Sequence, residues 1–404
     1  MSYKLRTTCR ACQGTELVPV FDLGVQPLAN DHKKPGEACQ GFYPLAINRC
    51  DRCGLAQLSV VVDPQVMYEH YTYTTSTSDT MFRHFQRLLT DIESEKVRRN
   101  VVEIGSNTGA LLNFMAKHGK FQTLGVEPAK NLAAMAETMS VSTIAKFFNF
   151  KAVSQIQSRM PHPGVVLARH VFAHIDDWQE FMACLEGIAD RDTLVCIEVP
   201  WVKDLLERVE FDSVYAEHLS YVSLKPVAHL LKATPFHIHR VIRYSIHGGA
   251  LLIMLRRNDS GVPTHLSADE FLAEENITAA DWQAFHYAAH KKIAALKELV
   301  GKLRLDGKIV SAFGASAKAT VLLNACKFTT NQIAFVTDNS PLKPGCLVPG
   351  TGIPIIEEGQ MLSEHPDYVI LTAWNYREEI LAKNAKYRSR GGKFIIPGKE
   401  VEII

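Results

Sequence analysis

The chain has 404 residues, enough for two or three domains that each bury a core of their own. Lys and Arg together number 44 and Asp and Glu 43, which leaves a formal net charge of +1. A balance this even argues against a nucleic acid as the main partner. The first residues contain no apolar signal core, and no run approaches the roughly 20 apolar residues that span a bilayer. We therefore expect a cytoplasmic protein with no membrane partner.

Four of the nine cysteines form two pairs, each with two residues between its members and a glycine soon after it. The pairs are Cys9 with Cys12 and Cys50 with Cys53. Two such pairs supply four thiolates in a tetrahedron, the arrangement that holds a structural zinc ion. A redox role needs only one pair, usually in a thioredoxin-like context that this stretch lacks. We predict a zinc-binding lobe over residues 1–65, with every metal position filled by protein.

Residues 68–78, which follow the lobe, are dense in aromatic and hydroxyl side chains. This stretch is either a polar connector or a cap over a polar ligand, where aromatic faces and hydroxyl donors would each have a use. Residues 80–96 then have the pattern of a helix that leads into the first core strand.

Residues 101–109 predict a strand, a tight turn and the start of a helix. They read V-V-E-I-G-S-N-T-G, with two glycines four positions apart. Glu127, followed by Pro128, ends the next apolar run, where an acidic side chain binds the two hydroxyls of a ribose. The loop lacks the lysine of a phosphate-binding P-loop. A ligand with a ribose but no phosphate fits better, and S-adenosylmethionine is the commonest such ligand; the alternative is that the glycines serve only helix packing.

Strand-like and helix-like segments keep alternating after this turn. Residues 165–168 and 193–199 are apolar enough for buried strands, and residues 176–188 between them have a helical pattern. Such alternation predicts a mostly parallel sheet covered on both faces, with ligands at the carboxyl ends of its strands. His170 and His174 lie just past one such end, where a histidine either takes part in catalysis or hydrogen-bonds a loop.

Two tyrosines, a carboxylate and an imidazole stand within residues 215–221, which read Y-A-E-H-L-S-Y. Such groups are costly to place beside an apolar core unless they serve one another or a ligand. Glu217 could orient His218 and raise its basicity. The alternative is a hydrogen-bonded surface turn.

The central domain, residues 66–255, closes with His247, two glycines and the apolar run 250–255. Residues 267–303 then form one continuous helical pattern, which begins with a capping box of serine and glutamate.

A second strand, turn and helix begins at residue 308 and reads K-I-V-S-A-F-G-A-S-A-K. Its serine and lysine are donors suited to phosphate oxygens at a helix N-terminus. We predict a second doubly wound unit over residues 256–404, shaped for a phosphorylated ligand; the alternative is a Rossmann-like unit used for packing or dimer contacts. The candidate contacts in its turns and at its strand ends are Gly314, Ser316, Lys318, Asp338, Trp374 and Asn375.

Together these motifs resemble the sugar C-methyltransferases that act on nucleotide-linked 4-keto deoxyhexoses. That family joins a zinc lobe, an S-adenosylmethionine domain and a C-terminal α/β domain, and the resemblance covers essentially the whole chain. The matching positions are the four cysteines, 71–78, 103–109, Phe147 and Phe148, His174 with Ile175, 215–218, 247–249, and 314–318 with Asn324.

The resemblance implies an α/β protein with a zinc-binding lobe, a Rossmann-like methyltransferase domain and a second Rossmann-like domain. It also implies that a dTDP-linked hexose with a 4-keto group binds between the two α/β domains. The catalytic positions it implies are Tyr215, Glu217, His218 and His174. The cofactor positions are Tyr73, Glu103, Gly105, Ser106, Asn107, Thr108, Gly109, Glu127, Pro128, Phe147, Phe148 and His170. The substrate positions are Tyr71, Ser76, Ser78, His247, Gly314, Ser316, Lys318, Asn324, Asp338, Trp374 and Asn375.

Two positions depart from the family pattern. Ala216 stands where the family often has histidine, and in an extended segment it would share a face with His218. The predicted base would then lack one polar neighbour. Lys146, ahead of Phe147, stands where an acidic residue often helps to hold adenine.

The implied chemistry matches these residue types. A proton on the carbon beside a ketone can be removed if the resulting enolate is stabilised, and a base with a pKa near 7 suits that task. We predict His218 as the base, with Tyr215 and His174 as donors to the developing oxyanion. Methylation at C3, favoured over C5, would give a branched-chain sugar.

Other readings of the sequence remain open. They are a sugar O- or N-methyltransferase, an RNA-directed methyltransferase or zinc-ribbon module, and a non-catalytic protein that keeps the fold. We expect a monomer or a weak homodimer.

Overall fold

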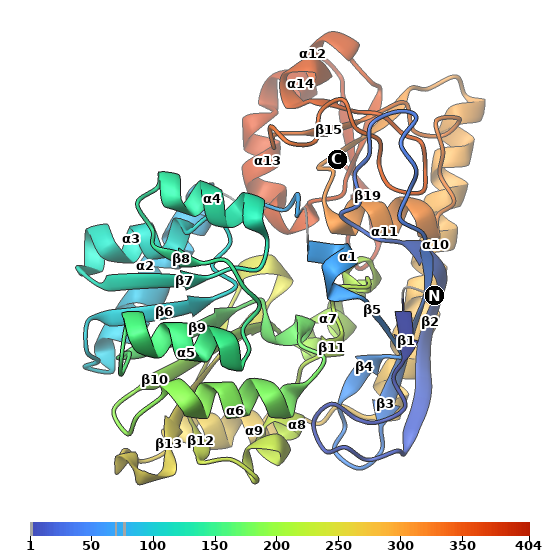
Figure 1. Ribbon diagram of the computed structural model, residues 1–404. Coiled ribbons are helices and arrows are strands. Elements are labelled where there is room, and N and C mark those ends of the chain that lie inside the picture. The colour runs from blue at the N-terminus through green and yellow to red at the C-terminus, as the bar shows by residue number, and fades with distance from the viewer. Residues whose placement is uncertain (1–2, 69–70, 76–77) are drawn as a thin grey trace.

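The computed structural model describes residues 3–68, 71–75 and 78–404 (Figure 1). Ser76, a predicted substrate contact, lies outside the described residues. Within the described residues the strands form sheets of two, four, seven and six strands. The chain is a mixed α/β protein, as predicted.

The N-terminal lobe is built on antiparallel strands. Its larger sheet has the order β11-β4-β3-β2, and β1 pairs with β5 in a smaller one. The strands are β1 (Tyr3–Leu5), β2 (Leu17–Pro27), β3 (Phe42–Cys50), β4 (Ala56–Leu58), β5 (Val60–Val62) and β11 (Ser220–Tyr221). Because β11 belongs to a much later stretch of the chain, the lobe and the central domain share one sheet. A short helix, α1 (Pro64–Tyr68), ends the lobe.

The central domain is a seven-stranded sheet in the order β12-β13-β10-β9-β6-β7-β8. Its strands are β6 (Asn100–Ile104), β7 (Gln122–Val126), β8 (Thr143–Ile144), β9 (Val165–Arg169), β10 (Leu194–Pro200), β12 (Phe236–Tyr244) and β13 (Ala250–Arg257). All are parallel from β8 to β10, and β13 runs antiparallel to both of its neighbours.

Helices cover both faces of this sheet (Figure 1). Val102 and Ile104 of β6 enter one apolar core and Val101 enters another, because successive side chains of a strand point to opposite faces. The helices of this part of the chain are α2 (Asp79–Ser94), α3 (Ala110–Gly119), α4 (Lys130–Thr138), α5 (Phe150–Arg159), α6 (Trp178–Ile188), α7 (Val202–Arg208), α8 (Leu224–Leu231) and α9 (Leu266–Glu274).

The C-terminal domain contains the six-stranded sheet, in the order β16-β15-β14-β17-β18-β19. Its strands are β14 (Val310–Phe313), β15 (Val336–Asp338), β16 (Ile355–Glu357), β17 (Tyr368–Leu371), β18 (Lys393–Pro397) and β19 (Val401–Ile403). Only β19 is antiparallel to its neighbour, so this is a second doubly wound unit. The helices are α10 (Ala279–Leu305), α11 (Ala317–Ala325), α12 (Met361–Glu364), α13 (Arg377–Lys383) and α14 (Ala385–Ser389).

The prediction of a single helix over residues 267–303 is wrong, because a non-helical segment separates α9 from α10. The capping box at the start of the long helix is Thr278 with Asp281. Glu275 explains the break. Its buried carboxylate accepts hydrogen bonds from Trp201 Nε1 at 2.9 Å and from the backbone of Leu224 at 3.0 Å. These tertiary contacts are not visible in a helical pattern.

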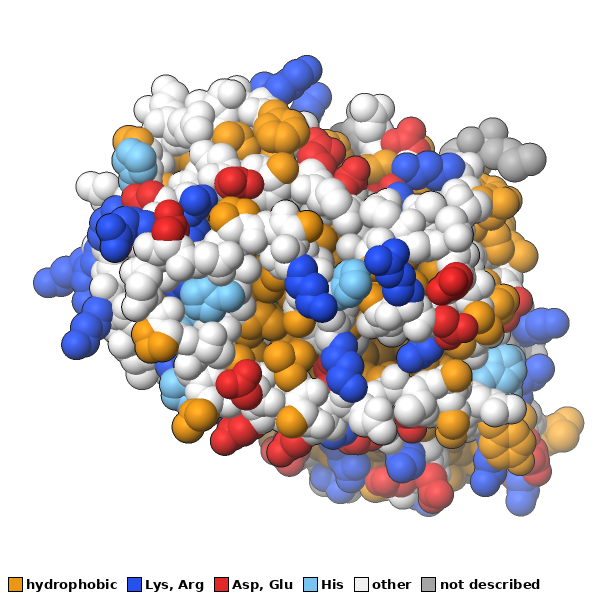
Figure 2. All heavy atoms as spheres, turned by 90° about the horizontal axis from the view of Figure 1, so that it is seen from below, with side chains coloured by type: hydrophobic (Ala, Val, Ile, Leu, Met, Phe, Trp, Pro, Cys, Tyr) orange, Lys and Arg blue, Asp and Glu red, His pale blue; other side chains and the backbone are white. Residues whose placement is uncertain are grey.

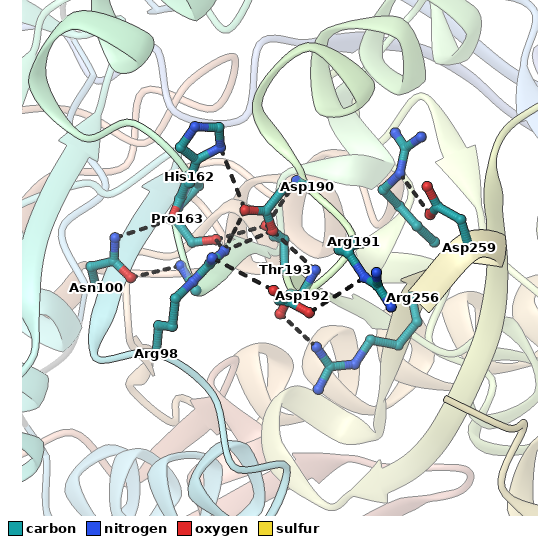
Figure 3. A network of polar contacts seen from close by, with 12 residues as sticks. Arg98, Asn100, His162, Pro163, Asp190, Arg191, Asp192, Thr193, Arg256 and Asp259 are labelled. Carbon is teal, nitrogen blue, oxygen red and sulfur yellow. Dashed lines mark hydrogen bonds and ion pairs between the residues drawn. The ribbon is translucent and has the colours of Figure 1, made fainter. Parts of the chain in front are cut away.

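A polar network holds the amino ends of the central strands, away from the carboxyl ends that carry the candidate site (Figure 3). Asn100 Oδ1 accepts the backbone N–H of Gly164 at 2.8 Å, and Asn100 Nδ2 donates to His162 O at 3.2 Å. Arg98 Nη2 donates to both oxygens of Asp190, at 2.7 and 2.8 Å. The network joins the starts of β6, β9 and β10, and we interpret it as structural.

Charges of both signs are interspersed over the face seen from below in Figure 2. In the described part of the chain, no helix is both long and apolar enough to cross a membrane.

Glu95, just after α2, provides a test of how this helix is attached to β12. Its carboxylate contacts His239 Nε2 at 2.9 Å and accepts a hydrogen bond from Arg240 at 3.1 Å. The hydrogen bond with His239 outweighs burial and lowers the pKa of Glu95 from 4.5 to about 2. A carboxyl group with a depressed pKa stabilises the fold above its unfolded pKa, and loses that effect as pH falls toward the folded value.

We predict that Glu95→Gln lowers the free energy of unfolding at pH 7 by about 1 kcal/mol. The variant should therefore unfold at a lower urea concentration than the wild type. The difference should shrink between about pH 4.5 and pH 2, since the unfolded chain takes up a proton in this range while the folded carboxyl group stays ionised until the pH nears 2. Glu93→Gln is the matched control, because Glu93 pairs with Arg99 at an exposed position. An equal loss of stability in both variants at pH 7 would contradict the role given to Glu95.

Candidate functional site

The turn between β6 and α3 requires glycine at two positions. Gly105 and Gly109 have φ of +67° and +74°, in the left-handed region. A Cβ atom on Gly105 would lie 2.2 Å from Cγ2 of Val171. The turn therefore brings backbone close to the end of β9, where only glycine fits.

Glu127 holds this turn in place from the end of β7. Its carboxylate accepts the backbone N–H of Asn107 at 2.8 Å and that of Ala129 at 2.9 Å. Burial raises the pKa of this carboxyl group. Contact between Glu127 and a ribose stays a prediction.

The polar groups beside the turn fit a ribose-bearing cofactor. Ser106 Oγ is buried and has no hydrogen-bond partner among the described residues, so a donor and acceptor are available at the turn. Glu103 is also buried, and Arg169 donates to it at 2.9 Å. The backbone N–H groups of residues 105–109 all donate to partners within the protein, so contact between a cofactor and this turn stays a prediction.

Of the two predicted cofactor contacts Phe147 and Phe148, Phe147 is the more exposed. Its side chain is exposed and lies edge-on to Tyr68, with ring centroids 6.3 Å apart. Phe148 packs against Phe181 in the core, with centroids 5.5 Å apart. A flat ligand can therefore reach Phe147 rather than Phe148.

The stretch predicted as a connector or a cap crosses the glycine turn. Asn107 Oδ1 accepts the backbone N–H of Thr75 at 2.9 Å, and Asn107 Nδ2 donates to Tyr73 O at 3.1 Å. Asn131 Nδ2 donates to Tyr71 O at 2.8 Å. Residues 71–75 thus lie as a strap across the predicted cofactor site.

His218 is held in one tautomer. Its Nδ1 lies 2.8 Å from the Ser213 carbonyl oxygen, which can only accept, so Nδ1 carries the proton. Its Nε2 then accepts a hydrogen bond from the Tyr215 hydroxyl, 2.7 Å away. Burial lowers the pKa of His218 well below its ordinary value, with His174 adding to the effect, so the ring is neutral at pH 7. This shift is opposite to the raised basicity and the pKa near 7 that the sequence suggested.

His174 lies next to this pair, with its ring centroid 5.2 Å from that of His218. Its Nδ1 is 3.0 Å from the hydroxyl of Tyr68, at the end of the N-terminal lobe. Burial lowers the pKa of His174 to about 4, with His170 adding to the effect. The four predicted catalytic residues are therefore gathered with residues of the lobe.

Glu217 does not orient His218 as the sequence suggested. It accepts hydrogen bonds from Asn30 Nδ2 at 2.8 Å and from the Tyr71 hydroxyl at 2.5 Å, both outside the central domain's sheet. The reason is that residues 215–218 form a turn, closed by a hydrogen bond from His218 N to Tyr215 O, rather than an extended segment. The turn also buries Ala216 in the apolar core, so no polar side chain is missing there.

Sequence reasoning missed three residues of this cluster. Tyr68 lies in the aromatic stretch that was singled out, so its position signalled a role. Asn30 and the Ser213 carbonyl gave no signal, because their contacts with Glu217 and His218 depend on how distant segments pack.

The C-terminal domain meets the cluster through Lys318, whose Nζ donates to Glu210 at 3.0 Å and lies 4.6 Å from the ring centroid of Trp374. Asn375 Oδ1 also accepts from Lys318, at 3.4 Å. His247 packs edge-on to His170 with centroids 4.7 Å apart, and His170 contacts the buried carboxylate of Glu198.

Several predicted ligand contacts have structural partners. Asp338 accepts the backbone N–H of Ala315 at 2.7 Å and so holds the second glycine turn, which includes Gly314 with φ of +94°. Asn324 Nδ2 donates to the carbonyl of Pro349 at 2.9 Å. Two predicted contacts are helix caps, namely Ser78 for α2 and Ser316 for α11.

The four paired cysteines converge as predicted. The Sγ atoms of Cys9, Cys12, Cys50 and Cys53 all lie within 4.8 Å of one another. The distances are 3.5 Å from Cys9 to Cys53 and 3.6 Å from Cys12 to Cys50. Four sulfurs about 2.3 Å from a tetrahedral zinc ion are about 3.8 Å apart, so the cluster fits zinc. Four protein ligands leave no open position, which makes the site structural.

We predict that Cys50→Ser loses zinc and loosens the N-terminal lobe, because three thiolates hold the ion poorly and binding is coupled to folding. Zinc per chain, about one in the wild type, should fall toward zero in metal analysis. Limited proteolysis should then cut the lobe first. Cys39→Ser is the control, since Cys39 is exposed and outside the cluster. Full zinc content in Cys50→Ser would contradict the assignment.

Three family models match successive parts of the chain. Residues 9–68 match a family described as a zinc-binding domain, and residues 73–241 match a methyltransferase domain. Residues 245–398 match the C-methyltransferase C-terminal domain.

Similar proteins include a full-length relative. C-methyltransferase NovU of Streptomyces niveus is 32% identical over 406 residues, covering 98% of this chain and 96% of that protein. Among solved structures, the N-methyltransferase NodS of Bradyrhizobium japonicum matches 45% of this chain and 99% of its own, with 12% identity and a TM-score of 0.34. A SAM-dependent methyltransferase of Archaeoglobus fulgidus matches 40% of this chain and 72% of its own, with 18% identity and a TM-score of 0.33.

The near-complete match to NovU agrees with the order of zinc cluster, glycine turn and second doubly wound unit seen in the structure. The chain belongs to the C-methyltransferase family, whose members are S-adenosylmethionine-dependent enzymes with a zinc-binding lobe.

Proposed function

We propose that the protein methylates a carbon next to the C4 ketone of a nucleotide-linked 4-keto-deoxyhexose. C3 is favoured over C5, and dTDP is the favoured nucleotide. The observation that carries the proposal is the state of His218, a neutral imidazole with its Nδ1 proton given to a backbone carbonyl and a lone pair on Nε2. That is the state a base needs to take a proton from carbon.

Two side chains beside this base can donate hydrogen bonds to an enolate oxygen. Burial raises the pKa of Tyr215 well above its ordinary value, with Glu217 adding to the effect, so its hydroxyl keeps its proton at neutral pH. Tyr215 can therefore turn from His218 Nε2 to an enolate oxygen when substrate enters. His174 is the second donor. Removing either donor should raise the activation free energy by about 2 to 4 kcal/mol.

The strap ties the base to the cofactor turn. Tyr71 in the strap donates to Glu217, one residue before His218, while Asn107 in the glycine turn binds the strap backbone at Tyr73. S-adenosylmethionine, when bound, supplies an electrophilic methyl group. A substrate held between base and cofactor would gain from this fixed geometry, since orientation accounts for a large part of such rate enhancements.

The nucleotide would lie toward the second glycine turn. The N-terminus of α11, just after Ser316, offers backbone N–H donors to phosphate oxygens. His247, Trp374 and Asn375 border the same side of the cluster. The sugar would then reach His218 from the C-terminal domain.

The proposal is tested by incubating the protein with methyl-labelled S-adenosylmethionine and a panel of nucleotide-linked 4-keto sugars in deuterated water. We expect labelled methyl on the carbon beside the ketone, and deuterium at that carbon when methyl transfer is blocked. Labelled methyl on oxygen or nitrogen, with no exchange at carbon, would establish the O- or N-methyltransferase instead. The absence of transfer to every sugar of the panel would reject the proposal.

We predict that His218→Asn lowers turnover by about 10²- to 10⁴-fold, because the base is lost while the turn keeps a polar side chain. The Kd for S-adenosylmethionine, measured by calorimetry, should stay within about threefold of the wild type, since the glycine turn is untouched. His162→Asn, on the opposite edge of the sheet, is the matched control and should keep full activity. Loss of cofactor binding in His218→Asn would contradict the role of base.

A further inference from the structure

The segment that precedes the base is held partly by the C-terminal domain. Residues 209–213 lie between α7 and the turn that contains His218, and α11 packs against them. Val209 has φ of +56°, an unusual conformation for a β-branched residue, so this backbone needs outside support. Lys292 of α10 provides part of it, donating to Val209 O at 3.0 Å from a buried position.

Two more contacts come from residues that follow strands β14 and β17 of the second doubly wound unit. Lys318 donates to Glu210 at 3.0 Å, and Trp374 Nε1 donates to Asp212 Oδ2 at 2.8 Å. Both carboxylates are buried, with 4% and 1% of Glu210 and Asp212 exposed. Removing one partner from a buried pair leaves an uncompensated charge, so these contacts hold the segment firmly.

The paired glycines after His247 make room for this contact. A Cβ atom on Gly248 would lie 2.4 Å from Glu210 Oε1, so the carboxylate rests directly on the backbone there. Gly248 has φ of +92°, which also favours glycine. The space beside Gly248 is therefore occupied by Glu210.

Glu210 is connected to the base by a short path. Ser213 N donates to Glu210 O at 3.0 Å, and the Ser213 carbonyl accepts the Nδ1 proton of His218 at 2.8 Å. Burial alone would lower the pKa of Lys318, but the Glu210 and Asp212 carboxylates outweigh it and raise that pKa. The lysine is therefore a cation at neutral pH and already has a carboxylate partner.

We propose that Lys318 is a positioning residue, which holds the 210–213 turn through Glu210 and thereby fixes the tautomer and place of His218, instead of binding a substrate phosphate. The effect on catalysis rests on the proposed function, because it assumes that His218 is the base. The contact itself does not.

The first test is kinetic. Lys318→Met and Glu210→Gln should each lower kcat by about 10- to 100-fold while KM for the sugar nucleotide stays within about threefold, since a displaced base slows chemistry more than binding. The double variant should be no worse than the weaker single variant by more than about twofold, because both changes break one contact. Lys318→Arg, which keeps the ion pair, should restore most of kcat.

The second test needs no substrate. Hydrogen exchange of the peptide covering 209–218 should rise in Lys318→Met and in Glu210→Gln at unchanged far-ultraviolet circular dichroism. Lys308→Met is the matched control, because it removes an exposed lysine–carboxylate pair from the same domain. Its exchange at 209–218 and its kcat should equal those of the wild type.

A raised KM with unchanged kcat in Lys318→Met, and a silent Glu210→Gln, would make Lys318 a phosphate ligand and overturn the proposal. Unchanged exchange at 209–218 in both variants would overturn it as well. If the wild type methylates no keto sugar, the proposed function fails separately, and the exchange result still decides whether the contact holds the turn.

Discussion

The hydrogen bond from His218 Nδ1 to the Ser213 carbonyl is the constraint on which the site depends. It decides which nitrogen carries the proton and which carries the lone pair, and a backbone acceptor cannot change its own protonation. The surroundings act in the same direction, since burial lowers the pKa of His218. The tautomer of His218, the proposed base, is thus set by the backbone geometry rather than by a carboxylate partner.

Three parts of the chain meet around that imidazole. The lobe contributes Tyr68 and Asn30, the central domain Tyr215 and His174, and the C-terminal domain reaches the preceding turn through Lys318. None of these parts holds the cluster alone. All three parts of the chain therefore contribute to this cluster, and residues 71–75 connect it to the glycine turn after β6.

Local patterns predicted the elements of the fold and the residue types of the site. The cysteine spacing led to a real cluster, and the two glycine turns lie where the sequence placed them, because φ above zero and close backbone approach leave a local signature. Partners across long sequence separations were not predictable. Glu217 binds Asn30 and Tyr71 instead of its neighbour, and Glu275 interrupts a helical pattern through contacts with Trp201.

Strand β11 gives the zinc lobe an importance beyond its own stability. It pairs with β4 of the lobe and begins two residues after His218. Loss of the metal would therefore disturb strand β4, which pairs with β11 and so helps to place the turn that contains His218. Zinc would affect the site in this way without taking part in the chemistry. For the same reason, a lobe exchanged between relatives should fit poorly, because β4 of the new lobe would have to pair with a β11 that it did not evolve with.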